Sequence, residues 1–302
     1  MRGYSSLKNG LQKPLLKKIK IGLGTAGLEK GASDEKYVHF LKSAMNLGIA
    51  CIDTAEAYGN GSAERLVGEA IKNSERNNLI ITTKVSKEHL KYEDVINSAR
   101  NSLRRLRTEY IDVYLIHQPN PEIPLKETMR AMDVLVEKKM VKYIGVSNFS
   151  LELLREAQSY TKNKIAVNQV EYNLLKRSPE EGLLDYCQKN DIIVMAYRPL
   201  LKGKLMKKWF SPFTRLSKKY NKTAAQLSLN WLISKKNVIA IPRTSNAAHL
   251  KENLGAVGWE LSNEDYEKLD RDFKRLWYVY KFIAKYGKAA KRILPERRNR
   301  CY

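Results

Sequence analysis

Four polar residues stand at the ends of short apolar runs and are able together to deliver a proton: Asp53, Tyr58, Lys84 and His117. The runs read as β-strands and cover residues 48–52, 79–83 and 111–116. A tyrosine is a weak acid, with an ordinary pKa of about 10, but a buried ammonium nearby favours the phenolate and makes the proton transferable. We expect Lys84 to be that ammonium, Asp53 to keep it charged and placed, and His117 to give the same oxygen a second hydrogen bond. These four groups predict the reduction of a carbonyl group.

Eight apolar runs of strand length recur along the 302 residues, with amphipathic helical stretches between them. The runs are Ile19–Leu23, Gly48–Ile52, Leu79–Val85, Ile111–Ile116, Val141–Val146, Ile165–Val170, Ile192–Tyr197 and Val238–Ile241. Fully apolar strands that alternate with helices favour a parallel sheet covered by helices. No linker rich in Pro, Gly or Ser interrupts the series. The pattern therefore predicts one (β/α)8 TIM barrel over residues 1–302, with a basic helical extension at 271–302.

Helix signals support this alternation. Apolar residues at helical spacing predict helices over Glu35–Leu47, Ala63–Lys72 and Tyr92–Arg107, the first opened by Ser33-Asp34. Ser178-Pro179 reads as a cap followed by proline at the first helical position. We expect residues 4–18 to form a small hairpin that plugs the barrel floor.

A dinucleotide-binding Rossmann fold is the competing interpretation. Residues 22–27 match G-x-G-x-x-G after a strand, and Asp53 ends the next strand, as the ribose-binding acid would. Those glycines must open a helix whose N-terminus faces the pyrophosphate, but residues 28–33 intervene before the cap at Ser33. Eight repeats also exceed the six strands of that fold, so we expect the glycines to form a turn at the barrel mouth.

Six motifs give the chain a resemblance to the aldo-keto reductase family. They are the stretches 53–59, the strand-end Lys84, 115–119, 145–149, 168–173 and 241–253, in order along the chain. The resemblance implies a nicotinamide-dependent oxidoreductase on a (β/α)8 barrel, with an aldehyde or ketone as the small substrate. By it, Tyr58 is the general acid, Lys84 and Asp53 set its pKa, and His117 orients the carbonyl.

The same resemblance implies the cofactor site. The carboxamide of the nicotinamide would be held by Ser147, Asn148 and Gln169, and its ring would stack on Tyr197. Glu252 and Asn253 would reach the adenine end. A ribose 2′-phosphate would be bound by Arg243, Thr244 and Ser245 before a helix start. We also assign Gly24 and Thr25, at the barrel mouth, to this site.

Two residues depart from the family pattern. Many relatives have an arginine where this chain has His249, and imidazole is mostly neutral at pH 7, so NADPH is expected with NADH as an alternative. Arg198 stands where a serine usually follows the stacking aromatic, and a pyrophosphate contact is expected of it.

No metal site is indicated, because His39 and His89 have no Cys, His or carboxylate at ligand spacing. Three widely spaced cysteines suit a reducing compartment, and no apolar span or leader pattern is found. We therefore expect a cytoplasmic enzyme, present as a monomer or small homo-oligomer.

The net charge of +23 needs its own account. Residues 271–302 hold eleven Lys and Arg against two acids. Apolar residues at helical spacing within them are Phe273, Leu276, Trp277, Tyr280, Ile283 and Ala284. The favoured interpretation is a helix docked on the barrel, and the alternative is an arm for lipid or nucleic acid. An alternative function follows from the second view, a nucleotide-binding regulatory barrel docked through its basic tail.

Overall fold

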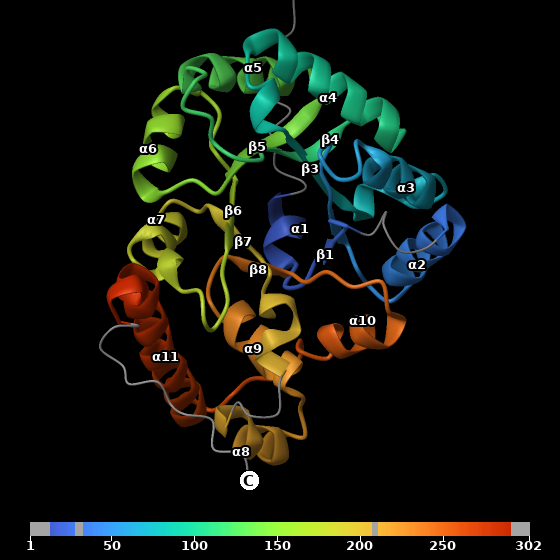
Figure 1. Ribbon diagram of the computed structural model, residues 1–302. Coiled ribbons are helices and arrows are strands. Elements are labelled where there is room, and N and C mark those ends of the chain that lie inside the picture. Colours follow the sequence, from blue (N-terminus) through green and yellow to red (C-terminus); the bar gives the residue numbers. More distant parts are fainter. Residues whose placement is uncertain (1–12, 28–32, 207–210, 291–302) are drawn as a thin grey trace, which may run out of the picture.

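The computed structural model describes residues 13–27, 33–206 and 211–290, and Figure 1 shows the helices set around a central barrel of strands. The strands are β1 Leu23–Gly24, β2 Cys51–Asp53, β3 Ile80–Val85, β4 Ile111–Ile116, β5 Val141–Ser147, β6 Val167–Glu171, β7 Ile193–Tyr197 and β8 Val238–Ile241. They follow one another in sequence order as parallel neighbours. The predicted (β/α)8 fold is confirmed.

Backbone hydrogen bonds between the first and last strand regions close the barrel. The amide of Gly22 donates to the carbonyl of Ala240 at 2.9 Å, and that of Gly24 donates to the carbonyl of Pro242 at 3.0 Å. The residues before Leu23 pair with β8 through an isolated bridge between Ile21 and Ala240 and do not continue as a strand, so β1 is shorter than the run Ile19–Leu23 predicted.

Eleven α-helices lie in the described part of the chain. They are α1 Lys13–Lys18, α2 Asp34–Asn46, α3 Ser62–Ile71, α4 Tyr92–Leu106, α5 Leu125–Glu137, α6 Leu151–Ser159, α7 Leu183–Lys189, α8 Ser211–Tyr220, α9 Ala224–Ile233, α10 Ala247–Leu254 and α11 Asn263–Ala290. Short 3-10 helices are η2 Arg76–Asn78, η3 Lys87–His89, η4 Ser178–Glu180 and η5 Leu201–Met206. The three helices predicted from apolar spacing end within one residue of α2, α3 and α4.

Two predictions about local structure are wrong. Residues 13–18 form a helix rather than part of a hairpin, and Leu16 of α1 is fully buried in the barrel interior beside Cys51 and Ile193. The stretch therefore does plug the floor, as a helix, because one apolar face is enough to cover the opening. Residues 4–12 lie outside the described part. Ser178-Pro179 begins the 3-10 turn η4, and α7 starts only at Leu183, after the left-handed Gly182.

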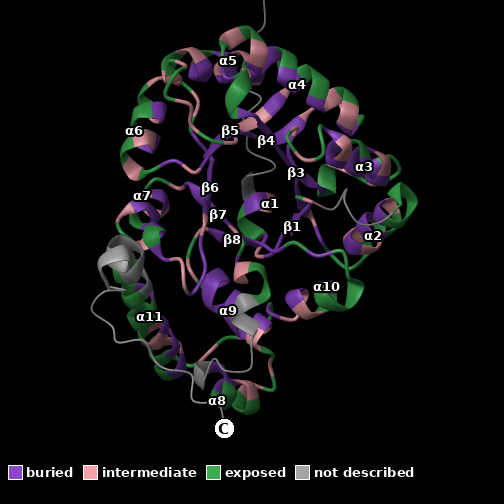
Figure 2. Ribbon diagram, viewed as in Figure 1, coloured by how far each residue is buried: buried purple, intermediate pink, exposed green. Residues whose placement is uncertain are grey.

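The core has two layers, one inside the barrel and a larger one between the strands and the surrounding helices. Figure 2 shows the buried residues on the strands and on the inner sides of the helices. Strands such as β3 and β4 are buried along their whole length, because helices cover one face and barrel side chains the other. Alternate residues therefore point inward, and those at the carboxyl ends reach the mouth of the barrel.

The start of the basic extension packs on the barrel. Phe273 and Trp277 of α11 are buried, and Phe273 lies against Phe213 of α8 with ring centroids 5.1 Å apart. Leu276, which the spacing assigned to the same stripe, is 39% exposed, because its side chain points away from the barrel. The side chains of Tyr280, Ile283 and Ala284 lie outside the described part, as do residues 291–302.

Candidate active site

Lys84 is the centre of the candidate site. Its side chain is fully buried, and its ammonium donates to Asp53 Oδ2 at 2.8 Å, to the carbonyl of Thr54 at 2.8 Å and to Tyr58 Oη at 3.1 Å. Asp53 is the last residue of β2 and Lys84 the penultimate residue of β3, so both belong to their strands rather than following them. Their side chains meet because both point inward at the carboxyl ends of neighbouring strands.

Tyr58 and His117 complete the group. His117 directly follows β4, and its ring lies edge-on to that of Tyr58, with centroids 5.6 Å apart and an interplanar angle of 81°. The fold thus brings together all four residues that the sequence predicted as a proton-delivery site, from three successive strand ends.

The charges of the site follow from its burial. Burial by itself would lower the pKa of Lys84, but the Asp53 carboxylate and the Tyr58 hydroxyl outweigh it and raise that pKa, so the ammonium stays charged. Burial and the Lys84 ammonium lower the pKa of His117 from 6.5 to about 4, against a smaller opposing effect of Glu56. At neutral pH His117 is therefore an uncharged imidazole that donates or accepts a hydrogen bond and carries no acid proton.

The loop between β2 and α3 fixes the position of Tyr58. Three residues with left-handed backbone follow it, Gly59, Asn60 and Gly61, with φ of 57°, 51° and 79°. The left-handed φ of Gly61 favours glycine there, and a Cβ added at this position would also push against the Arg105 side chain, whose Cδ would lie 2.4 Å away. On the other side of Tyr58, the Glu56 carboxylate accepts the backbone N–H of Ser86 at 2.7 Å. The loop is thus held at both ends.

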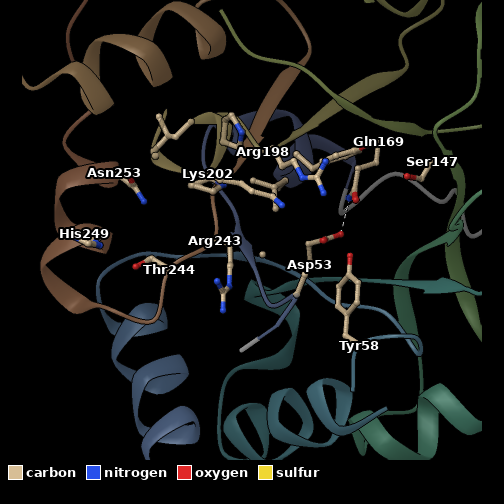
Figure 3. Close-up of a pocket in the computed structure, with 18 of the residues that line it drawn as sticks. Asp53, Tyr58, Ser147, Gln169, Arg198, Lys202, Arg243, Thr244, His249 and Asn253 are labelled. Atoms are coloured by element: carbon tan, nitrogen blue, oxygen red, sulfur yellow. Dashed lines mark hydrogen bonds between the residues drawn. The ribbon is translucent and has the colours of Figure 1, made fainter. Parts of the chain in front are cut away.

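A cavity of about 820 Å³ opens in front of this group. Its lining includes Asp53, Tyr58 and His117 at one part and the β8–α10 region at another, while Lys84 lies behind Asp53 and does not reach it. Figure 3 shows Arg198, Lys202 and Arg243 around the space in front of Asp53 and Tyr58. The volume is within the range of about 300 to 1,000 Å³ that is typical of ligand sites.

The residues predicted for the carboxamide lie directly beside the proton-delivery group. The Gln169 amide donates to Asp53 Oδ1 at 2.7 Å, and the dashed line in Figure 3 marks this bond. Asn148 has a left-handed φ of 64° and accepts the hydroxyl of Tyr197 at 2.9 Å. Ser147 is buried and accepts the Asn148 amide at 3.1 Å. The cavity is lined by Ser147, Asn148 and Gln169, and by Tyr197.

The residues predicted for the 2′-phosphate surround the start of α10. Arg243 is exposed and donates from Nη2 to the carbonyl of Gly27 at 2.7 Å. Backbone N–H groups at the start of α10 were expected to be free for a phosphate, but two of them are used. The Asn246 side chain accepts the N–H of Ala248 at 2.7 Å and that of His249 at 3.4 Å. The Thr244 hydroxyl is engaged too, with the backbone of Asn246, so a phosphate here would depend on the Arg243 guanidinium more than on the helix start.

The cavity gathers the other predicted contacts as well, with two exceptions. Gly24, Arg198, His249, Glu252 and Asn253 line it. Thr25 and Ser245 do not. Thr25 is buried, and its backbone N–H and hydroxyl both donate to the carbonyl of Asp53, at 2.9 and 3.1 Å, so it ties β1 to β2. Ser245 is exposed outside the cavity.

Lys202 and Gln118 line the cavity without having been predicted. Lys202 belongs to the basic stretch after β7, where Arg198, Leu201 and Lys202 all have left-handed φ, of 50°, 48° and 55°. The basic composition of this stretch was the only signal in the sequence. Three cations, Arg198, Lys202 and Arg243, thus face a cavity whose carboxylates are Asp53 and Glu252. Asp53 is already paired with Lys84, and Arg198 with Glu171 at 3.6 Å, which leaves Lys202 and Arg243 against Glu252. This excess of positive charge fits an anionic ligand such as a dinucleotide phosphate.

The described residues contain no group of three or more His, Cys, Asp or Glu side chains able to hold a metal ion. Among the same residues, no helix has the length and apolar character needed to cross a membrane.

The comparisons with known proteins agree on one family. The model of the Aldo/keto reductase family matches residues 20–272. Methylglyoxal reductase YeaE of Escherichia coli is 35% identical over 260 residues, which are 84% of this chain and 90% of that protein. The crystal structure of the thermostable aldo-keto reductase Tm1743 with epalrestat superposes with a TM-score of 0.81 at 44% identity, covering 83% of this chain and 94% of the other. An aldo-keto reductase from Klebsiella pneumoniae in complex with NADPH gives a TM-score of 0.78 at 36% identity, with coverage of 84% and 90%.

Proposed function

The chain belongs to the aldo/keto reductase family, as an NADP(H)-dependent oxidoreductase that reduces an aldehyde or ketone to an alcohol, and we propose that Tyr58 is its general acid. The observation that supports this role is the Lys84 ammonium, which is buried and donates to Tyr58 Oη at 3.1 Å. No other hydroxyl at the cavity has a charged partner of this kind among the described residues.

The proton step follows from these contacts. When the Tyr58 hydroxyl gives its proton to the carbonyl oxygen, the phenolate that forms faces the Lys84 ammonium, which stabilises it. Asp53 keeps that ammonium charged and in place through the 2.8 Å contact. His117 is neutral, so it offers the carbonyl oxygen an N–H hydrogen bond that fixes its direction but supplies no proton.

Bound NADPH would supply the hydride. We assign its carboxamide to Ser147, Asn148 and Gln169, and its ring to the face of Tyr197. The adenine end is assigned to His249, Glu252 and Asn253, and the 2′-phosphate to Arg243 and Thr244. Arg198 is the proposed partner of the pyrophosphate. Gly24 lines the cavity, and its backbone lies close to β8, because a Cβ there would lie 3.2 Å from Ile241 Cγ2. NADH remains an alternative cofactor, since His249 stands where an arginine would favour NADPH.

For the substrate we propose a small reactive aldehyde or dicarbonyl compound. The relatives named methylglyoxal reductase and glyoxal reductase, the latter from Bacillus subtilis at 36% identity, point to this class. The lining of the cavity mixes polar side chains, such as Gln118 and His117, with apolar ones, such as Leu200 and Ile241. Small polar carbonyl compounds suit such a lining.

The regulatory alternative is not favoured, since the proton-delivery group is complete and a purely nucleotide-binding role would not need it. We keep one catalytic domain, a cytoplasmic location and a monomer or small homo-oligomer as proposals.

Purified protein tests the function directly. We expect consumption of NADPH, followed by its absorbance, with methylglyoxal, glyoxal and a panel of simple aldehydes, ketones and keto acids. The matched control is Tyr58→Phe, which should bind NADPH and leave it unconsumed. A wild-type protein that binds NADPH but reduces none of the panel would contradict the proposal.

A further inference from the structure

The helix α11 buries one narrow stripe of its surface. Asp265, Leu269, Phe273 and Trp277 recur every four residues, and all are buried. Asp265 accepts Lys219 Nζ at 2.6 Å and the Tyr220 hydroxyl at 2.7 Å, and both of these residues belong to α8. Further along, the side chain of Asp270 accepts Arg177 at 2.5 Å and the indole N–H of Trp231 at 2.9 Å. One face of α11 is therefore fixed to the body of the protein, and its orientation is set.

Most of the exposed large apolar side chains in the described part of the chain lie on the outer surface of α11. Six large apolar side chains are exposed in the described part of the chain, and four of them lie on α11: Leu276, Tyr278, Val279 and Phe282. At about 100° per residue, Tyr278 and Val279 lie well over 100° around the helix from Phe273, so they cannot join the buried stripe. Figure 2 shows the outer side of α11 in the colour of exposed residues.

Cations lie among these apolar residues, together with one half-buried acid, Asp272. Arg271, Lys274 and Arg275 are exposed, and none of the ion pairs in the described part of the chain includes them. Lys281, also exposed, pairs with Glu181. The sequence shows an excess of positive charge over the whole extension, since residues 271–302 hold eleven Lys and Arg against two acids. The family match ends at residue 272, so the residues of this surface other than Arg271 and Asp272 lie beyond it.

We propose that the outer face of α11 binds an anionic lipid surface, with Tyr278 and Val279 entering the headgroup region and Arg271, Lys274 and Arg275 on the phosphates. A helix that combines exposed aromatic and aliphatic groups with a cationic border has the chemistry of an interfacial helix. Two other occupants fit less well. A second copy of the chain, placed symmetrically, would bring the same cations together, and single-stranded nucleic acid would leave the aliphatic Leu276 and Val279 without bases to stack on.

The test compares vesicles of phosphatidylglycerol and phosphatidylcholine in a sedimentation assay with the full chain, at low and high salt. We expect binding to the anionic vesicles only, weakened by salt. The charge variant Lys274→Glu/Arg275→Glu and the apolar variant Tyr278→Ser/Val279→Ser should each lose at least tenfold in affinity.

Matched controls separate this surface from the overall charge of +23. Lys126→Glu/Lys138→Glu changes two exposed cations on and next to α5, which Figure 1 places on the other side of the barrel from α11. Leu47→Ser/Val257→Ser changes the two remaining exposed apolar groups. Both controls should bind vesicles as the wild type does, and all variants should keep its melting temperature and NADPH affinity.

Three results would overturn the proposal. The first would be that the wild type fails to bind anionic vesicles, whether or not it binds nucleic acid. The charge variant and its control lose binding equally, which would indicate a diffuse field. The apolar variant binds as tightly as the wild type, which would mean that no side chain enters the lipid. The test is independent of turnover, so it stands apart from the proposed enzyme function.

Discussion

Replacing Tyr58 by phenylalanine tests the core of the proposed mechanism, because it removes one hydroxyl and little else. The ring still has its edge-on contact with His117. Lys84 loses the 3.1 Å contact to the hydroxyl but keeps its two 2.8 Å contacts, to Asp53 and Thr54. We therefore expect a stability loss of only about 0.5 to 1.5 kcal/mol, the net value of one hydrogen bond.

The catalytic loss should be far larger. General acid catalysis contributes about 10² to 10⁴-fold, which corresponds to about 2.7 to 5.4 kcal/mol of transition-state stabilisation. Steady-state turnover of methylglyoxal with NADPH measures the loss, and fluorescence titration should give an unchanged Kd for NADPH. Tyr110→Phe is the matched control, since Tyr110 stands just before β4, at the other end of the barrel, and its hydroxyl donates to Asn77 of η2. If Tyr58→Phe turns over within tenfold of the wild type, Tyr58 is not the acid.

Three further predictions concern the cofactor, pH and the extension. Arg243→Ala should weaken NADPH by about 1.5 to 3 kcal/mol and leave NADH nearly unchanged, measured by fluorescence titration; equal losses would place the 2′-phosphate elsewhere. Because the pKa of His117 falls from 6.5 to about 4 on folding, the unfolded chain binds a proton in that window that the folded protein does not, so stability should fall as pH drops through it. Urea unfolding at pH 7, 5.5 and 4.5 should show a smaller fall in His117→Asn, and an identical fall would show that another group is responsible. A chain ending at Asp270 should lose about 1.5 to 3 kcal/mol for each of the buried Phe273 and Trp277 and melt at a lower temperature, while an unchanged melting temperature would mean that α11 does not stabilise the barrel.

Strand and helix positions were largely predictable, because each depends on a local apolar period. The runs Ile111–Ile116 and Val238–Ile241 are β4 and β8 at the same bounds. The predicted bounds and types were wrong where contacts with residues far along the chain determine the local structure. Ile19–Leu23 yields only a short β1, since its first residues meet β8 near the closing seam. Residues 13–18 are helical because Leu16 fills the barrel floor.

The candidate site divides in the same way. The sequence by itself determined which residues end the strands, and inward-pointing side chains at neighbouring strand ends must meet, so Asp53, Lys84 and His117 were predictable as a group. Two features depended on the tertiary structure. Thr25 donates to the Asp53 carbonyl and does not line the cavity, whereas Lys202 does line the cavity. The tertiary structure also decided that Leu276 of α11 is exposed to solvent and that the pKa of His117 is lowered. The physical reason is that burial and charge are sums over neighbours from the whole chain, whereas strand and helix periodicity is written in a few consecutive residues.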